Sequence, residues 1–202
     1  DFGDGLRSIL RQDPDVVMIG EIRDLDTAST AAQAALTGHV LLSTLHTNSA
    51  IEAVPRLVNM GLPEFIIAPS LHTIIAQRLA RRVCKDCAVK KPLTDANKEI
   101  ISKTLADIVS VRPDLKQEMP TELITAVGCE KCSKTGYSGR VVIAEFISID
   151  DEIKGAVLNK MPAFKILELC RKKGFITMQE DGVLKVLDGI TTLDEVYRVT
   201  NV

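Results

Sequence analysis

The sequence has no hydrophobic run long enough to cross a membrane as a helix. Its longest apolar stretch, Leu62 to Ala76, contains Glu64, Ser70 and His72, whereas a membrane helix needs about 20 consecutive apolar residues. The first residues also lack the charged and then apolar pattern of a secretory signal. We therefore expect a soluble, cytoplasmic protein.

An excess of charge of one sign is also missing. The 202 residues include 25 Lys and Arg against 27 Asp and Glu, so no net field steers the protein toward nucleic acid or an anionic membrane. A chain of this length can form one large or two small domains with a substantial core. Because it begins without Met and moves at once into helix-forming residues, we expect that it starts inside a larger protein.

Cysteine is scarce, but its spacing is regular. Four of the five cysteines form two C-x-x-C pairs, Cys84 with Cys87 and Cys129 with Cys132. Two such pairs flanking a polar insertion favour a tetrahedral Zn²⁺ site over a disulfide framework or a redox pair. Since four thiolates leave no open position for a substrate, we expect the zinc to be structural. Cys170 stands alone in a helical pattern and is expected to be a buried small side chain.

Strand-like and helix-like stretches alternate between residues 6 and 83, which is typical of a parallel sheet covered by helices. Short buried strands are predicted at residues 16–20 and 39–45. The expected fold class is therefore α/β.

Cap residues predict where the helices of this region begin and end. The alanine-rich helix between the two strands is expected to start at Asp26 as N-cap and to stop at Gly38. A second helix follows, in which Ser49 and Glu52 have the spacing of a capping box and Gly61 is the stop.

The rest of the chain divides into a polar insertion and a mostly helical end. Helical patterns are found near 95–109, at 150–159, 162–173 and 179–187, and from Thr192, where a T-x-x-E capping box includes Glu195. We expect a parallel-sheet core at residues 1–83 and a zinc-bound insertion at 84–132, hereafter the cysteine module. A strand and a small helical domain follow at 133–202.

Polar residues follow both predicted strands of the core. The first strand is followed by Glu21, Arg23 and Asp24, and the second by Thr44, His46, Thr47 and Asn48. In open α/β sheets ligands bind at the carboxyl edge of the strands, where Glu21 could hold Mg²⁺ or polarise a water and His46 could contact a phosphate oxygen. A surface ion pair and a structural histidine are the alternatives. His39 is a weaker candidate, and His72, placed on a mostly apolar helix, is expected to be structural.

These stretches resemble the secretion-type ATPases that drive type II secretion and type IV pilus assembly. LRQDPDVVMIGEIRD is similar to their Walker B region and TGHVLLSTLHTNSA to their histidine box. AQRLARRVCKDC, GCEKC, GYSGRVVIAEF and DGVLKVLDGITTLDEVYRVT follow in the family's order. The resemblance covers essentially the whole chain, and the combination of motifs is highly specific.

The resemblance implies the C-terminal part of a RecA-like motor domain that acts as a hexamer beneath an inner-membrane platform protein. Glu21 matches the Walker B acid, expected to act on Mg²⁺ or on the attacking water, and Gly20 and Arg23 belong to the same signature. His46 matches the histidine-box residue that approaches the γ-phosphate, and His39 opens that box. Many assembly-type members also have a four-cysteine zinc module at this place.

One expected motif is missing, because no G-x-x-x-x-G-K-[ST] occurs in the sequence. That loop supplies the backbone N–H groups and the lysine that hold the phosphates of ATP. We therefore expect this chain to be the downstream part of a motor that binds ATP and Mg²⁺ only in a longer parent, and to be inactive alone.

Two other functions remain open at this point, a nucleic-acid-binding zinc ribbon and a purely structural assembly domain. Basic residues surround the first cysteine pair: Arg78, Arg81, Arg82, Lys85, Lys90 and Lys91. Such residues often meet phosphates, but this stretch has no aromatic residue on which a base could stack. We expect no nucleic-acid partner.

Overall fold

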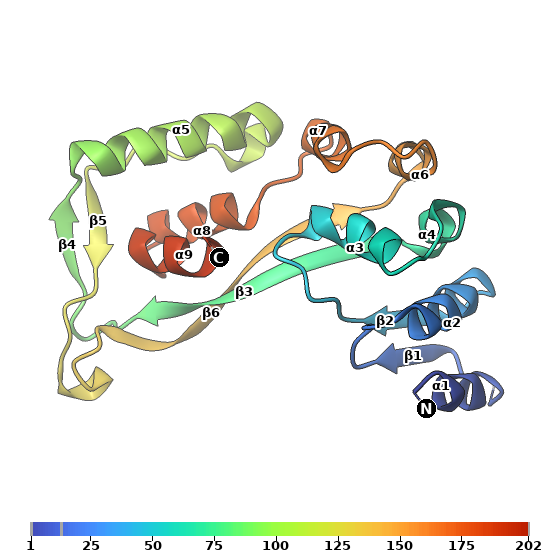
Figure 1. The fold of residues 1–202 in the computed structure, drawn as a ribbon. Coiled ribbons are helices and arrows are strands. Elements are labelled where there is room, and N and C mark those ends of the chain that lie inside the picture. The colour runs from blue at the N-terminus through green and yellow to red at the C-terminus, as the bar shows by residue number, and fades with distance from the viewer. Residues whose placement is uncertain (1, 13, 202) are drawn as a thin grey trace. The chain divides into compact units, whose positions relative to one another are not determined.

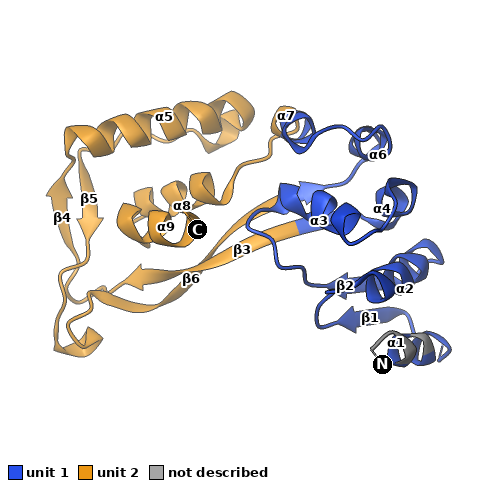
Figure 2. Ribbon diagram, in the orientation of Figure 1, with its two compact units in different colours: residues 1–74, 147–170 blue, residues 75–146, 171–202 orange. Residues whose placement is uncertain are grey.

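A computed structural model describes residues 2–12 and 14–201 of the chain (Figure 1). The chain forms two compact units, residues 1–74 with 147–170 and residues 75–146 with 171–202 (Figure 2). Within the described residues, none of the helices has the length and apolar character that a membrane crossing requires. Both units contain helices and strands, so the predicted α/β class is confirmed. The three-part division at residues 83 and 132 stays a prediction.

The first unit contains a two-stranded parallel sheet. Its first elements are α1 (Phe2–Leu10), β1 (Val16–Ile19), α2 (Leu25–Leu36) and β2 (Val40–Ser43). Strands β1 and β2 run in register from the pair Val16 and Val40 to the pair Ile19 and Ser43, as the order of strand, helix and strand predicts. Val17 is buried while its neighbour Val16 is exposed, because successive side chains of a strand point to opposite faces.

Helix α2 begins two residues earlier than the predicted cap implies, so the prediction of Asp26 as N-cap was wrong. Asp24 is the cap: it has an extended backbone, and its Oδ1 accepts the N–H of Thr27 at 2.8 Å. This N–H lacks a partner within the helix because it lies in the first turn. Asp26 lies within that turn instead. The stop at Gly38 is confirmed, since its φ of 101° lies in the left-handed region that glycine tolerates.

The capping box predicted from Ser49 and Glu52 was also wrong. Ser49 makes no capping hydrogen bond with its side chain. Glu52 Oε2 accepts the N–H of Asn48 at 3.0 Å, whereas a capping box would require it to accept the N–H of Ser49. The residues from Ala50 to Glu52 form a short 3-10 helix, η1 (Ala50–Glu52), and α3 (Ala53–Asn59) follows it directly.

The later segment of the first unit packs against α4 (Glu64–Ser70). This segment contains α6 (Asp151–Leu158) and most of α7 (Ala163–Lys172), and α6 lies against α4. His72 does not lie on a helix as predicted, because α4 ends at Ser70 and Leu71 turns to an extended conformation with ψ of 132°. The carbonyl of His72 instead accepts the N–H of Ile149 at 2.9 Å.

The described residues of the second unit form two two-stranded sheets and three α-helices. Strand β3 (Thr73–Val83) pairs with β6 (Tyr137–Ser148), and β4 (Val89–Pro92) is antiparallel to β5 (Glu122–Thr125). The helical elements are α5 (Asp95–Val111), η2 (Pro113–Leu115), η3 (Glu130–Cys132), α8 (Met178–Leu187) and α9 (Leu193–Thr200). The helices and the strand predicted beyond residue 84 are confirmed, with ends shifted by one or two residues.

The polar insertion has an apolar side that belongs to a core. Helix α5 packs against α8, and α8 against α9. The cluster consists of Leu93, Ile101, Leu105, Val183, Val186, Leu193 and Val196. Three of its members, Ile101, Val183 and Val196, are completely buried. The insertion is therefore held by the C-terminal helices as well as by the cysteine pairs.

Candidate functional site

The carboxyl ends of β1 and β2 lie at the same edge of the first sheet, because the two strands are parallel. Beyond the strands, the Thr44 hydroxyl donates to the carbonyl of Gly20 at 2.7 Å. The N–H of Ile22 donates to the carbonyl of Thr44 at 3.0 Å. These bonds hold the two connecting loops together and bring Glu21 next to His46.

Glu21 is the centre of a three-residue cluster at this edge. Its Oε2 accepts a hydrogen bond from Arg23 Nε at 2.5 Å and lies 3.0 Å from His46 Nε2. The hydrogen bond from Arg23, and then that from His46, lowers the pKa of Glu21. The carboxylate is therefore ionised at neutral pH and can accept a proton or bind a cation. The expectation that the second strand brings its polar residues beside Glu21 is confirmed for His46.

The other polar residues that follow the strands have structural partners. Asp24 caps α2. Thr47 donates its hydroxyl to the carbonyl of Ser49 at 3.0 Å, and Asn48 donates its N–H to Glu52. Glu21, Arg23 and His46 therefore remain as the candidates for a chemical role among the residues predicted for this edge.

His39 lies at the opposite end of β2 from His46. Its Nδ1 is 3.1 Å from the carbonyl of Ala34 and 3.2 Å from the hydroxyl of Thr37, at the last turn of α2. Because a carbonyl only accepts, Nδ1 donates its proton to Ala34. The structure does not bring His39 together with Glu21 and His46, so its role in nucleotide binding stays a prediction.

The four cysteines of the two C-x-x-C pairs converge in the second unit. Their Sγ atoms all lie within 4.8 Å of one another, and Cys132 Sγ is 3.7 Å from Cys129 Sγ and 3.8 Å from Cys87 Sγ. Sulfur atoms bound tetrahedrally to zinc at about 2.3 Å are about 3.8 Å apart. The four thiols are free, and they can hold one metal ion.

Backbone N–H groups prepare Cys132 to act as a ligand. Its Sγ accepts the N–H of Cys129 at 3.1 Å and that of Gly136 at 3.2 Å, and the former bond contributes most to a pKa lowered to about 6. Burial has the opposite effect on Cys87 and raises its pKa to about 12. A bound divalent cation would reverse this effect, because thiolates bind the metal in place of protons.

Glycines allow the tight path of the second cysteine loop. Gly128 has φ of 109° and Gly136 has φ of 78°, and both values strain other residues. A Cβ at Gly128 would lie 2.5 Å from the carbonyl oxygen of Lys134. The loop therefore depends on glycine where its backbone segments approach each other.

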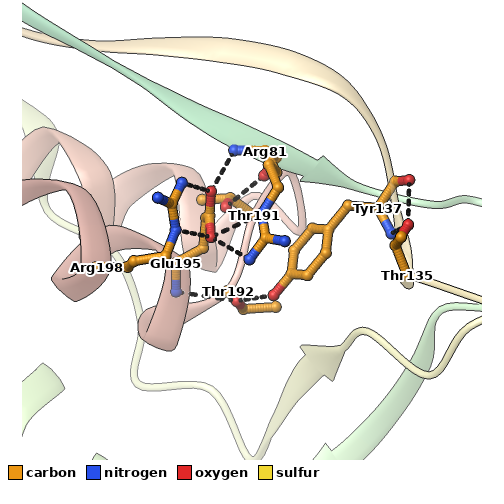
Figure 3. A network of polar contacts seen from close by, with 7 residues as sticks. All are labelled: Arg81, Thr135, Tyr137, Thr191, Thr192, Glu195 and Arg198. Carbon is orange, nitrogen blue, oxygen red and sulfur yellow. Dashed lines mark hydrogen bonds and ion pairs between the residues drawn. The ribbon is translucent and has the colours of Figure 1, made fainter.

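A buried carboxylate joins α9 to the strand that leads into the cysteine module (Figure 3). The side chain of Glu195 is completely buried. It accepts three hydrogen bonds from Arg81 (backbone N 2.8 Å, Nε 3.0 Å, Nη2 2.7 Å) and two from Arg198 (Nε 2.8 Å, Nη2 2.6 Å). Burial would raise the pKa of Glu195, but the hydrogen bonds from Arg198 and Arg81 outweigh burial and lower it to about 2.

The same network includes the start of β6. The Arg81 guanidinium lies 4.2 Å from the ring centre of Tyr137, and the Tyr137 hydroxyl is 2.9 Å from that of Thr192. Thr191 donates its hydroxyl to the carbonyl of Arg81 at 2.8 Å. Both strands that border the cysteine module are thereby fixed to α9 and the turn before it.

The sequence predicted the capping role of Thr192 in this network but not the arginine partners of Glu195. Thr192 caps α9 as predicted and accepts the N–H of Glu195 at 3.3 Å. The Glu195 carboxylate, however, bonds Arg81 and Arg198 rather than completing the predicted box. Because Arg81 is engaged here, the basic group around the first cysteine pair has one fewer cation to offer a nucleic acid.

Comparison with known proteins identifies the family. The family model for "Type II/IV secretion system protein" matches residues 1–198. The chain belongs to the type II/IV secretion system protein family. It is 44% identical to the type IV pilus assembly ATPase PilB of Thermus thermophilus, over 98% of this chain and 21% of that protein. It is 45% identical to the type II secretion system protein E of Aeromonas hydrophila, over 98% of this chain and 37% of that protein.

Solved structures agree with the expected fold. The pilus retraction motor PilT with bound ADP superposes with a TM-score of 0.64 at 24% identity, covering 98% of this chain and 43% of PilT. The ATPase DotB of Legionella pneumophila gives a TM-score of 0.63 at 22% identity, covering 100% of this chain and 42% of DotB. The resemblance to secretion ATPases predicted from the motifs is confirmed, and the chain spans less than half the length of each protein compared.

Proposed function

We propose that this chain is part of a motor that hydrolyses ATP to drive type IV pilus assembly or type II secretion. The observation that carries the proposal is the contact of Glu21 with His46 at the carboxyl edge of β1 and β2. Relatives at 44% and 45% identity are named as a pilus assembly ATPase and a secretion system protein E. The cluster supplies a carboxylate and an imidazole at the place where α/β sheets bind nucleotides.

Each residue of the cluster has a distinct proposed role. Glu21 orients the attacking water and accepts its proton, for which an ionised carboxylate is required. Arg23 keeps that carboxylate ionised, and His46 turns its Nε2–H from Glu21 to a γ-phosphate oxygen during transfer. Gly20 belongs to the nucleotide-binding edge through its carbonyl bond to Thr44, and His39 is retained as a nucleotide-binding candidate. Mg²⁺, when bound with ATP, would neutralise charge on the phosphates.

The cysteine module is proposed to hold one structural Zn²⁺ through Cys84, Cys87, Cys129 and Cys132. Their mutual distances and the chemistry of four sulfur donors support this choice of metal. The metal would join the two ends of the insertion that carries α5. We assign it no catalytic role because four thiolates complete its coordination.

The assembled motor is proposed to be a hexamer that works at the cytoplasmic face of the inner membrane through a platform protein. We also propose that ATP turnover requires a longer polypeptide, since this sequence contains no phosphate-binding loop motif. Kinetics of a longer protein that combines this chain with such a loop test the proposal. Replacing Glu21 with Gln there should abolish turnover while nucleotide still binds, and an unimpaired variant would refute the role of Glu21.

A further inference from the structure

The two cysteine loops also contact each other through a pair of charged side chains. Lys131 lies between the cysteines of the second pair, and Asp86 lies between those of the first. Lys131 Nζ is 2.5 Å from Asp86 Oδ1. The two residues are 45 positions apart in the chain, so this ion pair crosses from one loop to the other. The second oxygen of Asp86, Oδ2, lies 4.0 Å from Cys84 Sγ within the first loop.

Backbone hydrogen bonds order each loop, and one of them joins the loops at their base. The N–H of Ala88 donates to the carbonyl of Cys84 at 3.0 Å, and the N–H of Lys134 donates to that of Cys129 at 2.8 Å. The N–H of Cys84 donates to the carbonyl of Gly136 at 2.9 Å. The pair of Lys131 and Asp86 adds a side-chain connection between the central residues of the two loops.

We propose that Lys131 and Asp86 form a latch that holds the two cysteine loops together before the metal binds. The proposal rests on the zinc site proposed above and adds two positioning residues to it. Four ligands from two loops bind a metal more tightly when the loops are already ordered, because less conformational entropy is lost on binding. Lys131 in addition places a positive charge beside a site that carries net negative charge when four thiolates surround Zn²⁺.

The size of the effect is bounded by the exposure of the pair. The Lys131 side chain is 72% exposed and that of Asp86 is 48% exposed. Solvent screening limits an exposed pair to a contribution that corresponds to about a two- to fivefold change in an equilibrium constant. We therefore expect Lys131→Gln to weaken zinc binding by about that factor.

A second lysine of the same loop provides a matched control. Lys134 Nζ lies 3.4 Å from Glu130 Oε1, so this pair stays within the second loop. Lys134→Gln removes the same charge from the same loop but no contact between loops. It should change zinc affinity less than Lys131→Gln does.

The experiment measures zinc affinity of the 202-residue chain by competition with a chromophoric chelator. Lys131→Glu and Asp86→Lys should each weaken binding, and the double variant should regain most of the loss because the pair is restored with exchanged signs. Equal affinity of wild type and Lys131→Gln, or no recovery in the double variant, would overturn the latch while leaving the zinc site intact. A wild-type chain that binds no zinc would overturn the zinc site and the latch as a device for metal binding.

Amide hydrogen exchange of the zinc-free chain supplies a readout that does not depend on metal affinity. The N–H groups of Ala88 and Lys134 should exchange faster in Lys131→Gln than in the wild type, since their loops lose a mutual contact. In Lys134→Gln the amide of Ala88 should keep its wild-type rate. Equal rates at Ala88 in all three proteins would contradict the proposal.

Discussion

Replacing Glu195 with Gln tests whether its buried charge stabilises the second unit. The carboxylate accepts five hydrogen bonds from Arg81 and Arg198, and its pKa is lowered from 4.5 to about 2. Since each pKa unit corresponds to about 1.4 kcal/mol, the ionised form contributes roughly 3 kcal/mol to the free energy of unfolding. Glu195→Gln keeps the shape and loses the charge, so we expect a loss of about this size at pH 7.

The sign of the pH dependence follows from the lowered pKa. A carboxylate with a lowered pKa in the folded state contributes its full stabilisation above the unfolded value of 4.5 and loses it as the pH falls toward 2. The difference between wild type and Glu195→Gln should therefore be largest at neutral pH and shrink between about pH 5 and pH 2. A difference that stays constant over this range would show that charge is not the cause.

Tyrosine fluorescence during urea unfolding is a suitable assay. The chain has no Trp and only two Tyr, and both Tyr137 and Tyr197 lie in the second unit. Measurements at saturating zinc keep the metal contribution constant. Glu130→Gln is the control, because the Glu130 side chain is 90% exposed and its loss should change stability little. A Glu195→Gln variant as stable as the wild type at pH 7 would refute the reasoning.

Three further predictions concern the site, the metal and a helix cap. In a longer protein that combines this chain with a phosphate-binding loop, His46→Ala should lower turnover more than ATP affinity, whereas His72→Ala, at an exposed side chain, should change both little; equal kinetic losses would contradict the assignment. Elemental analysis of the purified chain should find about one Zn²⁺ per chain, and Cys129→Ser should lose it with a lower melting temperature while Cys170→Ser keeps it. Asp24→Ala should lower the melting temperature more than Asp26→Ala, because Asp24 caps α2; the reverse order in calorimetry would count against that cap.

The contact of Glu21 with His46 at the edge of the sheet could be predicted because its evidence is local. Apolar runs of strand length preceded Glu21 and His46, and the helix between the strands implied a parallel pair whose carboxyl ends meet. The cysteine site was predictable for a similar reason, since the spacing of each pair reflects ligand geometry.

Other features depend on contacts that no sequence pattern reports. One of the two arginine partners of Glu195, Arg81, lies 114 residues away in the chain, and nothing near either residue indicates that pairing. The cap of α2 was misplaced because Asp24 and Asp26 are chemically equivalent as caps, and only the backbone conformation decides between them. His72 was placed on a helix because its apolar surroundings suit a buried helix and a strand equally well.

The most direct test of the central claim is steady-state ATP hydrolysis by a longer protein that combines this chain with a phosphate-binding loop, with and without Glu21→Gln, together with nucleotide binding by the same two proteins. Glu64→Gln, on helix α4 of the same unit, is the control and should retain wild-type turnover. If Glu21 serves the attacking water, its variant should bind ATP nearly as well as the wild type and hydrolyse it orders of magnitude more slowly. A Glu21→Gln protein that hydrolyses ATP at the wild-type rate would contradict the account.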